Sequence, residues 1–125
     1  MSQKEVVISG VGLWTPEFSI SNEELVESYN AWASRYNEQH GEQIAKGALE
    51  EKPLSTAEFI EKASGIKARY CYTKDGILDI DRMKPRIPLR EEDQVSDQAE
   101  MAIAAAKKAM AAANCDASEI DAVIV

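Results

Sequence analysis

The last five residues of the chain constrain its fold more than any other feature. They read Asp-Ala-Val-Ile-Val, from Asp121 to Val125, and follow a long alanine-rich segment and a turn. Such an apolar run after a helix and turn is typical of a buried parallel strand, which needs neighbours on both sides. A domain usually ends in an exposed polar tail instead. The sequence therefore predicts a fragment, with the catalytic groups beyond Val125.

The composition predicts one compact domain, residues 1–125. The chain is 45% hydrophobic, without an apolar run near the roughly 18 to 20 residues that span a bilayer. The charged start leads directly into Val6, without the long apolar core of a signal peptide. A net charge of -8 repels nucleic acid. We therefore expect a cytoplasmic protein that binds neither nucleic acid nor membranes.

The cysteine pattern predicts no metal centre. Cys71 and Cys115 form no CxxC motif, and His40 is the single histidine in the sequence. Zinc sites and disulfide frameworks require denser spacing of ligands or cysteines. Two readings remain, buried thiols or a catalytic cysteine, and the first is favoured because the sequence places no base beside either residue.

Three helix starts are visible as capping patterns. Ser21 and Glu24 form a capping box, with Ile20 and Leu25 as a hydrophobic staple. The same pattern recurs over residues 54–59 and, in an aspartate version, over residues 115–120. These patterns predict starts near residues 22, 56 and 117, with the first helix reaching about residue 39 and the second ending at residue 65, a glycine.

A longer helix is predicted from Gln98 to Ala113. Apolar residues recur there at three-and-four spacing, but alanine also fills much of the remaining face. A helix with small side chains on nearly all of its faces can pack closely between a sheet and another layer or subunit. The alternative is an exposed helix in which alanine serves only its helix propensity.

The predicted strands alternate with these helices in an α/β order. Val6–Leu13 has apolar residues at both odd and even positions, so both faces of the predicted strand are apolar. This is expected of a central parallel strand, which we place beside Ala122–Val125. Arg69–Thr73 and Ile77–Ile80 flank Asp75-Gly76 and predict a hairpin. The polar stretch at about 30–53 is predicted to be an insertion, and its tail, Gly41–Pro53, is predicted to be a surface excursion.

Two loop motifs have competing interpretations. Gly10-Val11-Gly12 lacks the third glycine of a dinucleotide loop, so it reads as a tight exit from the strand. The loop at about 82–90 concentrates positive charge in an acidic chain, and it is either solvated or in contact with an anion. Its cations are Arg82, Lys84, Arg86 and Arg90.

Four blocks in order resemble the 3-oxoacyl-[acyl carrier protein] synthase III family of the thiolase superfamily. Ile8–Glu17 followed by Ser21–Leu25 is similar to the family's N-terminus. Glu58–Ile60, with Ser64-Gly65-Ile66 and Arg69, is similar to its E-W-I, T-G-I, x-x-R segment. Ser96-Asp97, the alanine helix and Asp116–Val125 resemble the helix and strand that precede the nucleophile. The resemblance covers nearly the whole chain.

The resemblance implies part of the N-terminal half of a layered α/β/α thiolase-like fold. It also implies a decarboxylative condensation that joins an acyl group from coenzyme A to malonyl-acyl carrier protein in fatty acid or related biosynthesis. The family's cysteine nucleophile and its histidine and asparagine match no residue of this chain, so the fragment alone is expected to be inactive. The intact protein is expected to be a homodimer without a prosthetic group.

The resemblance also implies where coenzyme A enters. The family's adenine-stacking tryptophan corresponds to Phe59, while the arginine that accompanies it corresponds to Ala63. Arg82, Lys84 and Arg86 are therefore candidate replacements for the missing cation, and the changes suggest a primer longer than acetyl. The competing interpretation is that Phe59 is only the staple partner of the preceding leucine.

Two classes of function remain open from the sequence. The first is a truncated type III condensing enzyme that uses acyl-CoA and acyl carrier protein. The second is a non-catalytic binding or assembly module that keeps the layers of the fold without the nucleophile.

Overall fold

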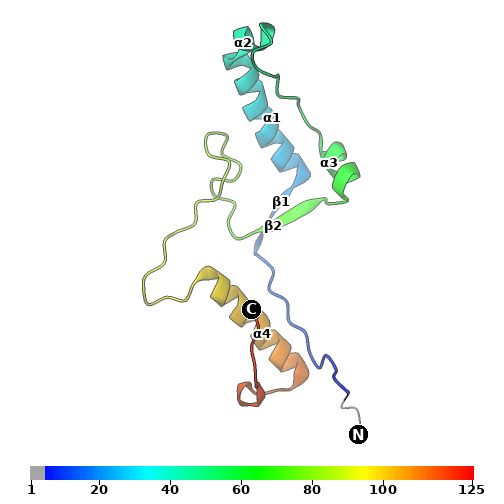
Figure 1. Cartoon of the computed structure of the whole chain (residues 1–125), viewed down its shortest axis with the longest axis vertical. Coiled ribbons are helices and arrows are strands. Elements are labelled where there is room, and N and C mark those ends of the chain that lie inside the picture. Colours follow the sequence, from blue (N-terminus) through cyan, green and yellow to red (C-terminus); the bar gives the residue numbers. More distant parts are fainter. Residues whose placement is uncertain (1–4) are drawn as a thin grey trace. The chain divides into compact units, whose positions relative to one another are not determined.

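The computed structural model describes residues 5–125, which form two compact units (Figure 1). The first, the α1 unit, comprises Pro16–Pro88, and the second, the α4 unit, comprises 5–15 and 89–125. Helices and a small sheet occur together, so the mixed α/β character is confirmed. In the described part of the chain, every helix is too short or too polar to cross a membrane.

The α1 unit is built around its first helix. Its elements are β1 (Phe18–Ser21), α1 (Asn22–Gln39), α2 (Gly41–Ala45), α3 (Ala57–Ser64) and β2 (Ala68–Cys71). Ile20 and Ala33 are the buried apolar residues among those described, so the core lies where β1 meets α1 and along one face of that helix. The short helix α2 falls inside the stretch Gly41–Pro53, which the sequence assigned to a surface excursion.

The capping box at the start of α1 is confirmed. The backbone N–H of Glu24 donates to the Ser21 hydroxyl at 3.1 Å, and the Ser21 N–H donates to the Glu24 carboxylate at 2.9 Å. Two backbone donors that would lack a helical partner are satisfied in this way. The helix therefore begins at Asn22 and runs to Gln39, the predicted bounds.

The second predicted capping box, over residues 54–59, does not form as predicted, although a helix starts there. Thr56 is the N-cap of α3, and its hydroxyl accepts from the Phe59 N–H at 3.1 Å. The backbone of Ser55 is already bound by the side chain of Asn30, through two hydrogen bonds of 2.8 and 2.9 Å. The helix ends as predicted at Gly65, whose φ of 72° suits a residue without a Cβ.

Asparagine side chains of α1 bind the extended segment that precedes α3, residues 52–55, which we call the strap. Asn37 donates to the Lys52 carbonyl at 2.9 Å and accepts from the Lys52 N–H at 2.8 Å. Asn30 makes the same pair of bonds to Ser55. The two asparagines are seven positions apart, or about two turns, and so share one face of the helix. A side-chain amide thus replaces the missing neighbouring strand.

The predicted hairpin around Asp75-Gly76 is wrong. β2 pairs with β1 instead, antiparallel, with Phe18 opposite Cys71 and Ser21 opposite Ala68. Residues 77–80 form no strand. Side chains of α1 bind carbonyls of this segment instead, because Ser28 donates to Leu78 at 2.9 Å and Arg35 donates to Ile80 at 3.0 Å.

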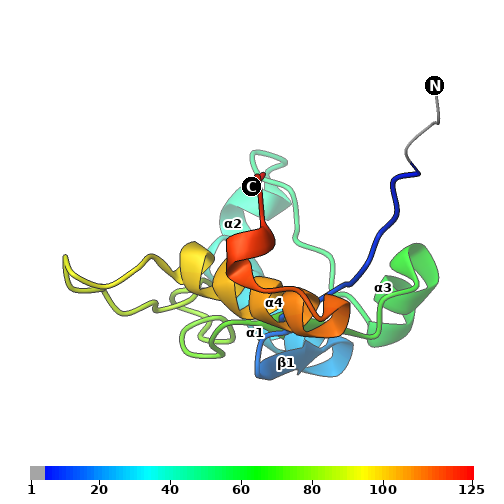
Figure 2. The same cartoon turned by 90° about the horizontal axis from the view of Figure 1, so that it is seen from below.

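The α4 unit contains α4 (Asp97–Ala113) and the short 3-10 helix η1 (Ala117–Glu119) (Figure 2). Ser96 caps α4 by accepting from the Ala99 N–H at 3.2 Å, so the helix begins at Asp97, one residue before the predicted start. Asn114 ends the helix with a φ of 50°. The aspartate capping box at η1 is confirmed. The Asp116 carboxylate accepts from a backbone N–H of the turn, and the Glu119 carboxylate accepts from the backbone N–H of Asp116.

The two glycines of the N-terminal motif allow close packing against α4. A Cβ at Gly12 would lie 2.0 Å from the Ala105 carbonyl oxygen, and one at Gly10 would lie 2.5 Å from that of Ala109. The alanine face of the helix brings its backbone close to this segment, which runs beside α4 (Figure 1). Lys108 then donates to the Leu13 carbonyl at 2.9 Å. The motif therefore serves packing, rather than only the exit from a strand.

The predicted parallel pair of strands is absent from the structure. Val6–Leu13 and Ala122–Val125 have no ladder partners among residues 5–125, and neither is drawn as an arrow (Figures 1 and 2). Their side chains are exposed, with Ile8 at 87% and Ile124 at 96%. A strand forms only where a second backbone completes its hydrogen bonds, and the apolar pattern alone supplies none.

Substituting Gly12 by alanine should destabilise the packing of the N-terminal segment on α4. The new Cβ would overlap backbone atoms of the helix, which cannot move aside as a side chain could, so we expect a loss of about 1–3 kcal/mol. Gly41→Ala is a matched control, because no atom lies within 4 Å of its added Cβ. Urea unfolding of the full chain measures both, and equal stability of the two variants would contradict the packing role.

Candidate functional site

An apolar cleft lies within the α1 unit, and we call it the α1–α3 cleft. Its volume is about 760 Å³. Its walls are α1, the strap with Thr56, α3 and the loop at 77–83. The lining residues are Leu25, Val26, Ser28, Tyr29, Pro53, Leu54, Ser55, Thr56, Phe59, Ile60, Ile77 and Met83. A cleft of this size is in the range that binds small molecules.

Polar groups in the wall of the cleft form hydrogen bonds within the protein. The Tyr29 hydroxyl donates to the Pro53 carbonyl at 3.0 Å, and the Ser28 hydroxyl donates to a loop carbonyl at 2.9 Å. The Thr56 hydroxyl caps α3, and the backbone N–H and carbonyl of Ser55 bind Asn30. These bonds fix the wall, and they leave its exposed surface chiefly apolar.

Phe59, the candidate stacking residue, lies in the wall of this cleft. It is 67% exposed, and its predicted staple partner Leu54, which also lines the cleft, is 61% exposed. A residue that served only as a staple would exclude more of its surface from water. The aromatic surface of Phe59 is therefore accessible to a ligand.

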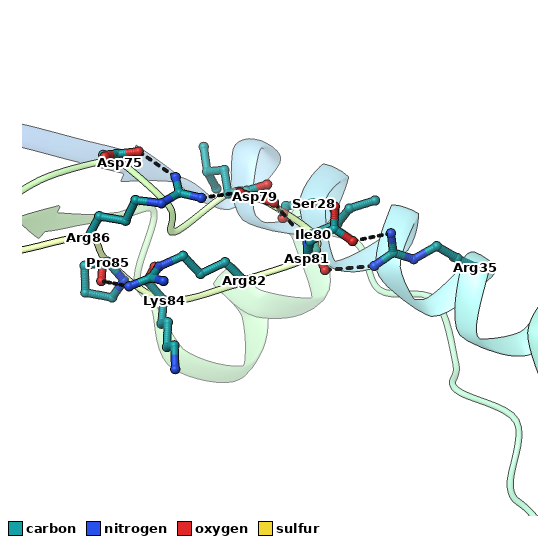
Figure 3. Close-up of polar contacts among 11 residues, drawn as sticks. Ser28, Arg35, Asp75, Asp79, Ile80, Asp81, Arg82, Lys84, Pro85 and Arg86 are labelled. Atoms are coloured by element: carbon teal, nitrogen blue, oxygen red, sulfur yellow. Dashed lines mark hydrogen bonds and ion pairs between the residues drawn. The ribbon is translucent and has the colours of Figure 1, made fainter.

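The basic segment folds into a compact loop, residues 75–86, which we call the Arg86 loop. Arg86 donates from its two terminal nitrogens to Asp75 at 2.9 Å and to Asp79 at 2.8 Å (Figure 3). Arg82 folds back to the carbonyls of Lys84 at 3.0 Å and Pro85 at 3.2 Å. Both arginines predicted to meet coenzyme A are thus bound within their own loop.

The ion pairs of Arg86 change the titration of their partners. The guanidinium hydrogen bond of Arg86 is the main cause that lowers the pKa of Asp79, with a further contribution from the Asp81 N–H. Asp79 and then Asp75 raise the pKa of Arg86 in return. Because the folded-state pKa of Asp79 is depressed, its contribution to stability is present at neutral pH and is lost as the pH falls through that pKa.

Lys84 differs from the two arginines. Among the described residues, its ammonium group makes no hydrogen bond or ion pair, and Figure 3 shows its side chain directed away from the carboxylates. Of the three candidate cations, Lys84 is therefore the one that an anion can meet without breaking a hydrogen bond or ion pair seen among the described residues.

Met83 was missed by the sequence reasoning, which considered only the cations of this loop. It lines the cleft and has a φ of 51°, a strained value for a residue with a side chain. Gly76 supports this geometry, because a Cβ there would lie 2.6 Å from the Lys84 carbonyl oxygen. Strain of this kind persists only where the surroundings enforce it, and it is frequent at binding sites. The sequence offered one signal for this residue, because Met83 is an apolar residue between two basic ones.

The Arg86 loop and the residue before it are also fixed to α1. Glu24 pairs with Lys74, which directly precedes the loop, at 2.6 Å, and Arg35 pairs with Asp81 in the loop at 2.6 Å. The hydrogen bond from Lys74 is the main cause that lowers the pKa of Glu24. One wall of the cleft is thus tied to the helix that forms another wall.

The two cysteines lie outside the cleft. Both are half-buried, whereas the sequence predicted buried thiols. Cys71 ends β2, and the Cys115 thiol donates to the Asp116 carbonyl at 3.5 Å, in a polar hollow that Glu119 also lines. These neighbours are carbonyl and carboxylate groups, whereas a cysteine nucleophile is activated by cations or a base. Within residues 5–125, no group of three or more ligand-type side chains could hold a metal ion.

Replacing Arg86 by glutamine should raise the pKa of Asp79 towards its ordinary value near 3.8. The variant loses the main interaction that stabilises the ionised carboxylate. The carboxyl ¹³C shift, followed by NMR as the pH falls, measures this pKa. Asp116 is an internal control, because its pKa is lowered by Ser118 rather than by Arg86. An unchanged Asp79 titration in the variant would refute the assignment.

Comparison with known proteins gives an independent indication of the chain's relationships. A search against protein-family models finds no match. The chain is 51% identical over 100 residues to a beta-ketodecanoyl-[acyl-carrier-protein] synthase of Pseudomonas aeruginosa. The matched region is 80% of this chain and 29% of that synthase, so the chain spans less than a third of its relative's length. The resemblance carried by the sequence blocks is thereby confirmed, and the chain matches a fragment of a protein of the 3-oxoacyl-[acyl carrier protein] synthase III family.

Proposed function

We propose that the whole protein is a type III condensing enzyme, which elongates an acyl-CoA primer with malonyl-acyl carrier protein. The 51% identity to a beta-ketodecanoyl-[acyl-carrier-protein] synthase carries this proposal. The name of that relative refers to a ten-carbon product, which supports a primer longer than acetyl here. Coenzyme A enters as part of the thioester substrate, with no prosthetic group.

The fold proposed for residues 1–125 is part of a layered thiolase-like domain that forms a homodimer in the cytoplasm. Two observations support the layered arrangement. Apolar segments at 6–13 and 122–125 are exposed, as strands without ladder neighbours would be. The alanine-rich α4 allows backbone approach at the two glycines of the first segment.

This part of the protein is proposed to contribute to the entrance for the acyl thioester. Phe59 offers an accessible aromatic face for the adenine ring, and Lys84 offers an unpaired ammonium for a phosphate. Arg82 and Arg86 hold the loop that carries Lys84, and each could reach a phosphate only by giving up its present contacts. We therefore rank Lys84 first among the three cations.

The reaction itself is assigned to groups that this chain does not contain. The acyl group would pass to a cysteine beyond Val125, and a histidine and an asparagine would stabilise the oxyanion that forms when malonyl loses CO₂ and attacks the thioester. Neither Cys71 nor Cys115 takes part. The chain alone is expected to transfer no acyl group.

In the full-length protein, Phe59→Ala should raise the KM for acyl-CoA about tenfold, because base–aromatic stacking contributes about 1–3 kcal/mol. Lys84→Glu should also raise this KM, and by less at high salt because ions screen the phosphate contact. The kcat of both variants should stay near that of the unmodified enzyme.

Steady-state formation of 3-oxoacyl-acyl carrier protein measures these constants. Lys107→Glu, a charge reversal at an exposed position of α4, serves as a matched control and should leave KM unchanged. If the unmodified full-length protein forms no 3-oxoacyl product, the proposed function is wrong. If KM is the same in all three variants, the entrance lies elsewhere.

A further inference from the structure

Asp79 lies at the point where the Arg86 loop is fixed to α1. Ser28 donates to the carbonyl of the preceding residue, Leu78, at 2.9 Å. Arg35 donates to the carbonyl of the following residue, Ile80, at 3.0 Å, and Figure 3 shows its side chain reaching the loop from the helix. The backbone on both sides of Asp79 is therefore held by the longest helix of the α1 unit.

The oxygens of Asp79 connect this fixed point to the second half of the loop. Its carboxylate accepts from the Asp81 N–H at 3.0 Å and from Arg86 at 2.8 Å. Its carbonyl accepts from the N–H groups of Arg82, at 3.0 Å, and Met83, at 2.7 Å. All three oxygens of the residue thus bind the segment 81–86. Because the pKa of Asp79 is lowered, chiefly by the Arg86 hydrogen bond, its carboxylate is ionised at neutral pH and accepts from both donors.

The second half of the loop contains the turn from which Lys84 projects. Met83 has a φ of 51°, a strained value that persists only where the surroundings impose it. The N–H of Lys84 then donates to the Gly76 carbonyl at 3.2 Å, and that of Arg86 donates to the Asp75 carbonyl at 2.9 Å. The loop is closed on itself in this way, and the closed backbone sets the direction of the Lys84 side chain.

From these contacts we propose that Asp79 is a positioning residue, which fixes the Met83–Lys84 turn and thereby presents the Lys84 ammonium to a phosphate of coenzyme A. The identity of the ligand rests on the proposed function, whereas the fixing of the turn does not. An acidic residue thus strengthens the binding of an anionic ligand. Direct electrostatics act in the opposite direction, because the negative charge of Asp79 repels a phosphate. The two effects give opposite predictions for a neutral substitution.

Calorimetric titration of the full-length protein with coenzyme A tests the proposal, because this measurement needs no catalysis. In Asp79→Asn an amide nitrogen, itself a donor, replaces one carboxylate oxygen, so either Arg86 or the Asp81 N–H loses its acceptor. We expect the affinity for coenzyme A to fall about threefold to fivefold, as for the loss of an exposed contact between charges. An affinity that rises, as the loss of a negative charge alone would cause, would overturn the proposal.

Asp75→Asn is the matched control. It removes the same charge and also takes an acceptor from Arg86. Among the described residues, however, the Asp75 carboxylate binds no backbone group of the turn. We expect this variant to bind coenzyme A at least as tightly as the unmodified protein does. Equal weakening by the two substitutions would assign the effect to the ion pairs of Arg86 and would refute the role of Asp79.

A combined variant distinguishes positioning from a general loss of structure. If Asp79 acts through Lys84, then Asp79→Asn should have no further effect on coenzyme A binding in a protein that already carries Lys84→Ala. Effects of the two substitutions that multiply would contradict the proposal. In steady-state assays Asp79→Asn should raise the KM for acyl-CoA and leave kcat unchanged.

Hydrogen exchange of the Met83 amide provides a readout that requires no ligand. It should accelerate in Asp79→Asn and stay unchanged in Asp75→Asn. Exchange of the Lys52 amide, which Asn37 binds, should stay unchanged in both and so reports that α1 is intact. Slow Met83 exchange in Asp79→Asn would show that the turn does not depend on Asp79. A full-length protein that binds coenzyme A but forms no 3-oxoacyl product would contradict the proposed function alone.

Discussion

The α1 unit depends on hydrogen bonds that polar side chains of α1 make to the backbone of irregular segments. Asn30 and Asn37 each satisfy both the N–H and the carbonyl of a strap residue. On another part of the helix, Ser28 and Arg35 bind carbonyls at 78 and 80. Each pair is seven positions apart, so it recurs after two helical turns. A single helix thereby organises two segments that have no strand partner of their own.

The cleft is a consequence of this arrangement. The strap forms one wall and the segment at 77–83 forms another, and both are positioned by α1. Arg86 then closes its loop through two carboxylates and sets Met83 in a strained conformation at the cleft. The same contacts neutralise the charge of Arg86, while Arg82 binds two backbone carbonyls and the Lys84 ammonium makes no contact of this kind among the described residues. The side chains of α1 that position the walls therefore also use up the polar groups of the walls, which leaves an apolar surface towards the cleft.

Local signals in the sequence predicted much of the helical structure. The Ser21–Glu24 box and Gly65 act within one helical turn, so their residue types alone specify the geometry. Pairing of β1 with β2 was missed because its partners are about fifty positions apart and neither is strongly apolar. The role of Asn30 was hidden because an asparagine on a helix reads as a surface residue until the segment opposite it is known. Phe59 was found through the family resemblance. Met83 was recognised only from the structure, by its positive φ and its place in the wall of the cleft.

Native-state hydrogen exchange of the Lys52 and Ser55 amides tests the central claim most directly, because these N–H groups donate to Asn37 and Asn30. In Asn37→Ala, exchange at Lys52 should accelerate about fivefold or more, since a hydrogen bond to a partly buried group contributes about 1 kcal/mol or more. Glu38→Ala, at the adjacent exposed position, should leave it unchanged. Equal exchange at Lys52 in both variants would show that α1 does not hold the strap.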